Sequence, residues 1–175
     1  FGKTLFNFNE LTSRYASWAI KPSNKKSSIY LKEAWKEFNK EKREIVVAVV
    51  DTGIDPRHPF FKDNLKVFNG GPSKKNYGVD FSAGSASKMM PFDNHGHGTH
   101  IAGIIRSVYP KVKLLVLKYY NPGASGQENL DSTVKALKYA VQNNVDIINY
   151  SGGGPEASNE ERKILKIAEK KGILI

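Results

Sequence analysis

Residues 45–55 read IVVAVVDTGID, an apolar run followed directly by a polar turn. The six residues 45–50 are mostly β-branched, a pattern typical of a strand that is buried on both faces of a parallel sheet. Because ligands bind at the carboxyl ends of such strands, Asp51 lies where a functional side chain is expected. Taken alone, Asp51 and Gly53 also fit an ordinary turn after a strand.

The rest of the chain alternates between strand-like and helix-like patterns. Apolar runs predict further strands over residues 112–117, 145–149 and 172–175, and helical spacing of apolar residues predicts helices over residues 29–39, 130–143 and 156–171. This alternation predicts an α/β fold, a parallel sheet flanked by helices on both faces. We expect the chain to stop within a strand, because its last four residues (GILI) open another buried run.

Composition sets the class of protein and its organisation. The 175 residues are 39% hydrophobic and 25% charged, as in ordinary globular domains, and contain no cysteine. This excludes disulfides, thiol nucleophiles and cysteine-based metal sites, and no apolar run reaches the roughly 20 residues that span a membrane. We interpret residues 1–28 as a polar extension or linker, and residues 29–175 as the N-terminal part of one domain. Its first helix has Ile29, Ala34, Trp35 and Phe38 available for one apolar face. Because the chain starts with Phe1, we expect a processed product or a piece of a longer protein.

The chain is strongly basic, with 27 Lys and Arg residues against 17 Asp and Glu residues and a net charge of +10. Such a charge can attract nucleic acid. The lysines are scattered along the sequence, however, and no DNA- or RNA-binding motif accompanies them. We therefore expect a solvated basic surface and no nucleic-acid partner.

A second polar segment, residues 93–103, reads DNHGHGTHIAG and contains three of the four histidines. Small residues between His95, His97 and His100 allow the backbone to approach other groups closely. The apolar residues that follow predict a helix that begins near His97. Three titratable side chains of a rare type within six residues indicate a functional site rather than unrelated surface histidines.

A third segment, Ser151, Gly152, Gly153 and Gly154, follows the predicted strand over residues 145–149. It is either a plain glycine loop or a backbone edge with which an extended peptide can pair. It lacks the Lys-Ser or Lys-Thr ending of a phosphate-binding loop.

Three chemistries could use these segments. The histidines approach a zinc-hydrolase pattern, but Thr99 stands where that pattern has a carboxylate ligand and no later histidine completes the site. Asp51 could belong to an aspartic-protease pair, but that fold is all-β and this chain alternates strands with helices. In the third chemistry, Asp51 orients His97, which then removes the proton from a serine hydroxyl.

The two segments together resemble the subtilisin-like serine proteases (subtilases), whose catalytic residues follow the order Asp, His, Ser. Residues 47–55 (VAVVDTGID) match the family's Asp motif, and residues 96–103 (GHGTHIAG) match its His motif. Residues 145–153 (VDIINYSGG) resemble the segment that leads to the family's substrate-binding strand. The resemblance covers roughly residues 15–175 and implies a serine endopeptidase.

The resemblance also implies a role for each matched residue. His97 would be the general base and then the general acid, and Asp51 would fix its tautomer and stabilise its charged form. Ser151, Gly152 and Gly153 would hold the backbone of a polypeptide substrate. Because most members of this family are secreted, the resemblance further implies a secreted or extracytoplasmic protein.

The family's serine motif and its oxyanion-hole asparagine motif are absent from the 175 residues, and we expect them after Ile175. Ser125 is no substitute, because it lies in the loop before a predicted helix. We therefore expect this chain alone to be inactive and to need the C-terminal part of the catalytic domain, in the same or another chain. The alternative is a non-catalytic pseudoprotease or binding scaffold of the same fold.

The sequence predicts no cofactor. Many secreted subtilases have a strong calcium site with an Asp ligand shortly after a His-Pro pair, and the resemblance places Phe60 at that position. The calcium loop after the His-motif helix is shortened to residues 107–111. We expect no metal at these positions, and calcium only at a site that the motifs do not reveal.

Overall fold

The computed structural model describes residues 18–20, 28–37, 43–61, 63–66, 77–82, 90–154 and 158–175. Within these residues, parallel strands form one sheet in the order β2-β3-β1-β4. The strands are β1 (Val46–Asp51), β2 (Gly78–Asp80), β3 (Lys113–Lys118) and β4 (Ile147–Tyr150). The apolar run before the Asp motif therefore forms a central strand, as its composition predicts.

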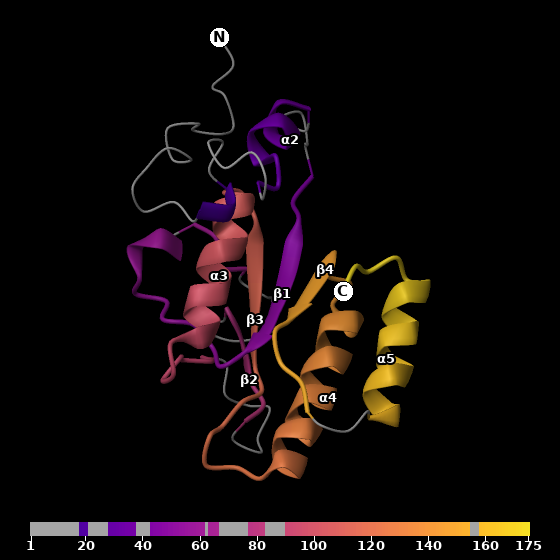
Figure 1. The fold of residues 1–175 in the computed structure, drawn as a ribbon. Helices are drawn as coiled ribbons and strands as arrows, with labels where there is room; N and C mark the ends of the chain where they lie inside the picture. Colours follow the sequence, from indigo (N-terminus) through magenta and orange to yellow (C-terminus); the bar gives the residue numbers. More distant parts are fainter. Residues whose placement is uncertain are drawn as a thin grey trace.

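Helices cover both faces of this sheet (Figure 1). Helix α3 (His97–Val108) packs on one face, and α4 (Gly126–Gln142) and α5 (Asn159–Lys170) pack on the other. Alternate residues of β1 enter the two layers, Val49 on the α3 side and Val50 on the α4 side, and both are buried. A strand that is covered on both faces needs apolar residues at successive positions. The predicted α/β fold is confirmed.

A small N-terminal layer extends the α3 side. Helix α2 (Leu31–Glu37) buries Trp35 against Ile20, and the Trp35 indole N–H donates a hydrogen bond to the carbonyl oxygen of Val108 (2.7 Å). This bond holds α2 at the C-terminal end of α3. The helix begins at Leu31, two residues after its predicted start, so Ile29 precedes it, is exposed and does not join its apolar face as expected.

Two 3-10 helices are also described, η1 (Trp18–Ile20) and η2 (Pro59–Phe61). The first lies within the predicted extension of residues 1–28, and its Ile20 packs against α2. Residues 1–17 and 21–27 of that extension lie outside the described residues.

The sequence does not predict β2, because three residues that include a glycine and an aspartate contain no apolar run. The strand pairs with β3, and a Cβ on Gly78 would lie only 1.8 Å from the carbonyl oxygen of Val116. At the other edge of the sheet, the strand predicted over residues 172–175 is reduced to one parallel bridge between Leu174 and Ile147.

Helix α4 begins earlier than its predicted start at residue 130, because Ser125 caps it. The Ser125 hydroxyl accepts a hydrogen bond from the N–H of Glu128 (3.2 Å), and the Glu128 carboxylate accepts one from the N–H of Ser125 (2.8 Å). This capping box satisfies N–H groups that have no partner within a helix. Ser125 therefore has a structural role, in keeping with its exclusion as a nucleophile.

We expect Ser125→Ala, in the protein that contains this chain, to lower the free energy of unfolding by about 1 kcal/mol, because the cap is lost. Urea unfolding followed by circular dichroism measures this change. Ser125→Thr keeps the hydroxyl and should change the free energy of unfolding much less. Equal values for the Ala and Thr variants would show that α4 does not depend on this cap.

Candidate active site

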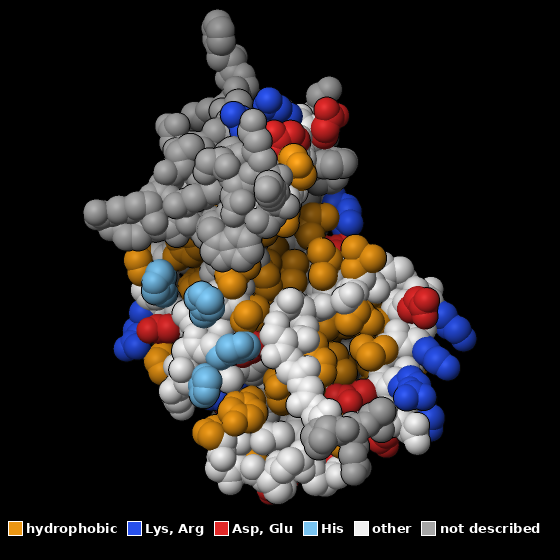
Figure 2. Space-filling model, in the orientation of Figure 1, with side chains coloured by type: hydrophobic (Ala, Val, Ile, Leu, Met, Phe, Trp, Pro, Cys, Tyr) orange, Lys and Arg blue, Asp and Glu red, His pale blue; other side chains and the backbone are white. Residues whose placement is uncertain are grey.

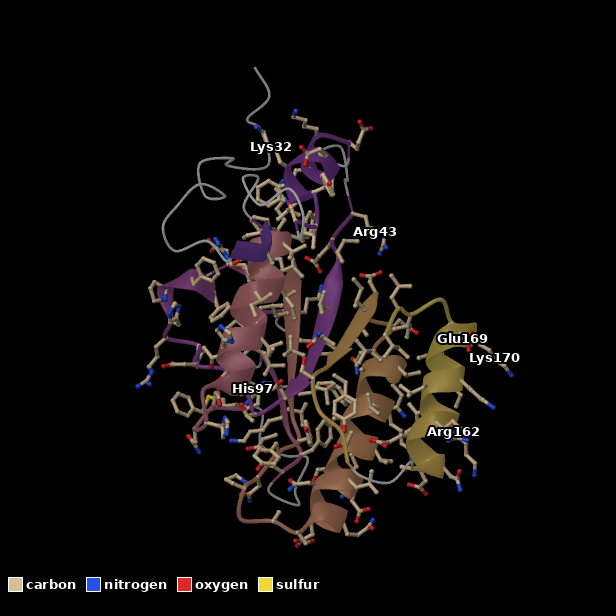
Figure 3. The ribbon with its side chains drawn as sticks, viewed as in Figure 1. Lys32, Arg43, His97, Arg162, Glu169 and Lys170 are labelled. Atoms are coloured by element: carbon tan, nitrogen blue, oxygen red, sulfur yellow. The ribbon has the colours of Figure 1, made fainter. Side chains whose placement is uncertain are left out.

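Asp51 and His97 meet at the carboxyl end of the central strand. Asp51 is the last residue of β1 and His97 is the first residue of α3 (Figure 3). The Nδ1 atom of His97 lies 2.8 Å and 3.0 Å from the two carboxylate oxygens of Asp51. The Asp51 side chain is 3% exposed and the His97 side chain is 44% exposed. A buried carboxylate thus orients an imidazole ring that remains accessible from solvent.

Two glycines let the first turn of α3 approach the turn after β1. A Cβ on Gly98 would lie 2.3 Å from the carbonyl oxygen of Gly53 and 3.1 Å from a carboxylate oxygen of Asp51. Gly53 has a φ of +108°, a region that favours glycine, and a Cβ there would lie 2.5 Å from the carbonyl oxygen of Pro91. These glycines of the two motifs allow His97 to reach Asp51.

Asp93 connects the two motifs through five hydrogen bonds. One carboxylate oxygen accepts from the Thr52 hydroxyl (2.8 Å) and from the main-chain N–H groups of His95 (2.9 Å) and Gly96 (2.8 Å). The other accepts from the hydroxyl (2.6 Å) and the N–H (2.9 Å) of Thr99. Burial would raise the pKa of Asp93, but these bonds stabilise the carboxylate, so that the net effect lowers its pKa to about 2.

The two threonine hydroxyls extend this network. Each donates to Asp93 and also accepts a main-chain N–H, Thr52 from Gly98 (2.9 Å) and Thr99 from Asp55 (3.0 Å). The turn after β1 and the first turn of α3 are therefore bonded to each other and to one carboxylate.

Asp93 opens the histidine segment, and the sequence predicts no such role for it. A signal was present. An Asp three residues before a glycine at the start of a helix is well placed to accept hydrogen bonds from nearby main-chain N–H groups.

The residues predicted to bind substrate, Ser151, Gly152 and Gly153, follow β4 and are exposed. Because β4 pairs with β1, Ser151 leaves the sheet level with Asp51. A Cβ on Gly152 would lie 2.1 Å from the hydroxyl oxygen of Tyr119, so this position accommodates no side chain without a shift. Within the described residues, no main-chain hydrogen bond reaches these three residues, which leaves their N–H and C=O groups available for pairing.

A pocket of about 350 Å³ opens beside the residues that flank the catalytic pair. Its lining includes Thr52, His95 and Tyr120, together with the buried Asp80 and Lys118. The His95 ring lies 6.0 Å from the Tyr120 ring, measured between ring centroids. Figure 2 shows the histidine side chains gathered on the α3 side of the molecule.

The remaining polar residues of the motifs face solvent or form other contacts. Asp55 forms an ion pair with Arg57 (2.9 Å), whose hydrogen bonds lower the pKa of Asp55, and His100 is exposed on α3. Among the described residues, the His97 ring forms hydrogen bonds only with Asp51.

Neither a metal centre nor a membrane span is found in the part of the chain that the structure describes. No group of three or more His, Asp or Glu residues there could hold a metal ion. No helix there is long and apolar enough to cross a membrane.

The sequence profile of the subtilase family matches residues 42–175 of this chain. The chain belongs to the subtilase family. The major intracellular serine protease of Bacillus subtilis (strain 168) is 36% identical over 152 residues, which cover 82% of this chain and 44% of that protein. The minor extracellular protease Epr of the same organism is 28% identical over 182 residues, which cover 99% of this chain and 24% of that protein.

A crystal structure of a lanthipeptide protease shares the subtilase fold of this chain. Its TM-score is 0.54, its sequence identity is 22%, and the match covers 81% of this chain and 39% of that chain. This subtilase chain thus spans less than half the length of the relatives that it matches. These relatives include an intracellular and an extracellular protease, so secretion does not follow from family membership.

The lowered pKa of Asp93 predicts how acid affects stability. A carboxylate stabilised in the folded state contributes to folding above its ordinary pKa of 3.8, and this contribution is lost as the pH falls toward about 2. The free energy of unfolding should therefore fall over this range, and fall less steeply in Asp93→Asn. Urea unfolding at about pH 5 and about pH 2.5 measures the difference. Asp131→Asn, at an exposed site on α4, should behave like the unsubstituted protein; equal pH dependence in all three would contradict the assignment.

Proposed function

We propose that the protein containing this chain is a serine endopeptidase with an Asp-His-Ser triad, to which this chain contributes Asp51 and His97. The observation that carries the proposal is the hydrogen bond between the buried Asp51 carboxylate and Nδ1 of the accessible His97 ring. Membership of the subtilase family supports the same class of reaction, because relatives of the chain are serine proteases.

In this mechanism, His97 Nε2 accepts the proton of a serine hydroxyl while the serine oxygen attacks the carbonyl carbon of the substrate. The protonated ring then donates that proton to the leaving amine. In the second half of the reaction, the ring takes a proton from the attacking water and returns one to the serine. Every transfer passes through Nε2, which must be free when the ring accepts a proton, while the other ring proton stays on Nδ1 throughout.

Asp51 provides that condition. Its carboxylate accepts the hydrogen bond from His97 Nδ1–H, which keeps the proton on Nδ1 and stabilises the charged ring. The carboxylate is itself held by the main-chain N–H of Thr52 (2.7 Å) and by its place at the end of a paired strand. It therefore orients the ring without needing to take the proton.

The proposed substrate is a polypeptide. An extended segment would pair with the open main chain of Ser151, Gly152 and Gly153 as an added strand. Because Ser151 leaves the sheet level with Asp51, this edge is suited to carry a peptide past His97. The serine and the oxyanion donor lie outside the 175 residues in this proposal, so this chain alone is inactive and needs the rest of the catalytic domain.

We expect His97→Ala, in the complete protein, to lower kcat for a peptide substrate by at least about 10⁴-fold, because no other group removes the serine proton. Hydrolysis of a fluorogenic peptide measures the change. His100→Ala, an exposed position on the same helix, is the matched control and should stay active. Undiminished turnover in His97→Ala would remove His97 from the role, and a wild-type protein that binds peptides without cleaving them would favour the scaffold alternative.

The described residues do not fit the strong calcium site of secreted subtilases. Phe60 stands where the resemblance places an Asp ligand, and the guanidinium carbon of Arg106 lies 3.9 Å from the centre of the Phe60 ring. Phe60 also contacts the Phe61 ring edge-on (5.8 Å between centroids). A cation and two apolar rings do not suit an ion that needs about six to eight oxygen ligands.

Calcium chelation should therefore change the melting temperature of the protein by less than about 2 °C, because no bound ion is lost. Thermal unfolding in calcium-containing buffer and in excess EDTA measures the difference. A large fall with EDTA that calcium reverses and magnesium does not would reveal a calcium site elsewhere in the protein.

A further inference from the structure

Asp93 is 8% exposed, and its five hydrogen bonds go to groups on both sides of the site. On one side is Thr52, which follows Asp51 in the chain. On the other side is Gly96, which precedes His97. Within the described residues, no lysine or arginine pairs with this carboxylate, so its charge is balanced by main-chain and hydroxyl donors alone.

We propose that Asp93 is a positioning residue, which fixes the Asp51–His97 geometry by holding the neighbour of each. The kinetic consequence of this proposal rests on the proposed peptidase function, whereas the geometric consequence does not. Asp93 forms no hydrogen bond with Asp51 or His97 in the structure, so it acts through the residues between them.

Thr52 transmits the effect to Asp51. Its main-chain N–H donates to the Asp51 carboxylate (2.7 Å), while its hydroxyl donates to Asp93 (2.8 Å) and accepts from the N–H of Gly98 (2.9 Å). Both ends of Thr52 are therefore fixed. If the Asp51 carboxylate rotated away from His97, its hydrogen bond from the Thr52 N–H would be strained. Thr52 could keep that bond only by moving, which would break its hydrogen bond to Asp93.

On the other side, Asp93 supplies the cap that α3 lacks. The residue before the helix is Gly96, which has no side chain to bond the free N–H groups of the first turn and has a φ of 96°. The Asp93 carboxylate accepts hydrogen bonds from the N–H groups of Gly96 and Thr99, and the Thr52 hydroxyl accepts one from the N–H of Gly98. The first turn of α3, with His97 in it, is thereby held against the turn after β1.

The two carboxylate oxygens of Asp93 have different partners, which makes the proposal testable. One oxygen bonds Thr52, His95 and Gly96, next to the catalytic pair, and the other bonds Thr99. Asp93→Asn can keep the first set through its amide oxygen but places an NH₂ group against the N–H of Thr99. Asp93→Ala loses both sets.

In the complete protein, Asp93→Ala should lower kcat by at least about tenfold with little change in KM, since small displacements of catalytic groups cost about that much or more. Asp93→Asn should have a lower melting temperature than the wild type but keep most of kcat. Leu137→Ala, in the core of α4 on the other face of the sheet, should also lower the melting temperature and leave kcat unchanged at temperatures where the protein is folded. This pattern separates positioning from stability.

A second measurement does not depend on proteolysis. The Nδ1 proton between His97 and Asp51 is expected to give a low-field NMR signal, which should shift or vanish in Asp93→Ala and persist in Asp93→Asn and Leu137→Ala. A wild-type protein that cleaves no peptide would end the proposed function and leave this signal to decide the role of Asp93.

Wild-type kcat and an unchanged low-field signal in Asp93→Ala would overturn the proposal. Equal losses of kcat in Asp93→Ala and Leu137→Ala would also overturn it, because stability alone would then explain the effect. If Asp93→Ala does not fold, Thr52→Val and Thr52→Ser replace it. Loss of the signal in the Val variant alone supports the proposal, and its persistence in both contradicts it.

Discussion

The contact between the first turn of α3 and the turn after β1 is the constraint on which the site depends. A side chain at Gly98 would meet the main-chain oxygen of Gly53, and that oxygen cannot retreat without displacing the end of β1. The end of β1 is fixed in turn, because this strand pairs with β3 and β4 and is covered on both faces. The strand thus places the helix, and the helix places His97.

Two buried carboxylates, Asp51 and Asp93, lie at this contact, and in the described residues neither has a lysine or arginine partner. Hydrogen bonds offset the cost of burying each charge. The donors to Asp93 are main-chain N–H groups and hydroxyls, whose protonation does not change, and they lower its pKa to about 2. Asp51 instead bonds an imidazole, which can gain or lose a proton. The two carboxylates therefore differ in their partners: Asp93 bonds groups of fixed protonation, and Asp51 bonds a ring that can carry a second proton.

The sequence predicts the elements that carry long apolar patterns, and it misses those fixed by tertiary contacts. Strand β1 and the pairing of Asp51 with His97 follow from the apolar run and the two motifs. Strand β2 owes its three residues to its register with β3, and no local pattern encodes that register. The predicted start of α4 is too late, because the capping box at Ser125 is formed by polar groups, which the spacing of apolar residues does not reveal. Asp93 escaped for a related reason, since its donors come from two segments that meet only in the folded chain.

The register of β1 connects the core with the site. Val47 and Val49 pack in the α3 layer and Ala48 and Val50 in the α4 layer, so Asp51 continues the row that faces α3. Side chains alternate along a strand, and a slip of one residue would therefore turn Asp51 toward α4, away from His97. Such a slip would also move each buried valine into the opposite layer, where it would lose the neighbours against which it is packed. The hydrophobic core thus does more than stabilise the fold, because the same packing keeps the buried carboxylate on the face where the histidine lies.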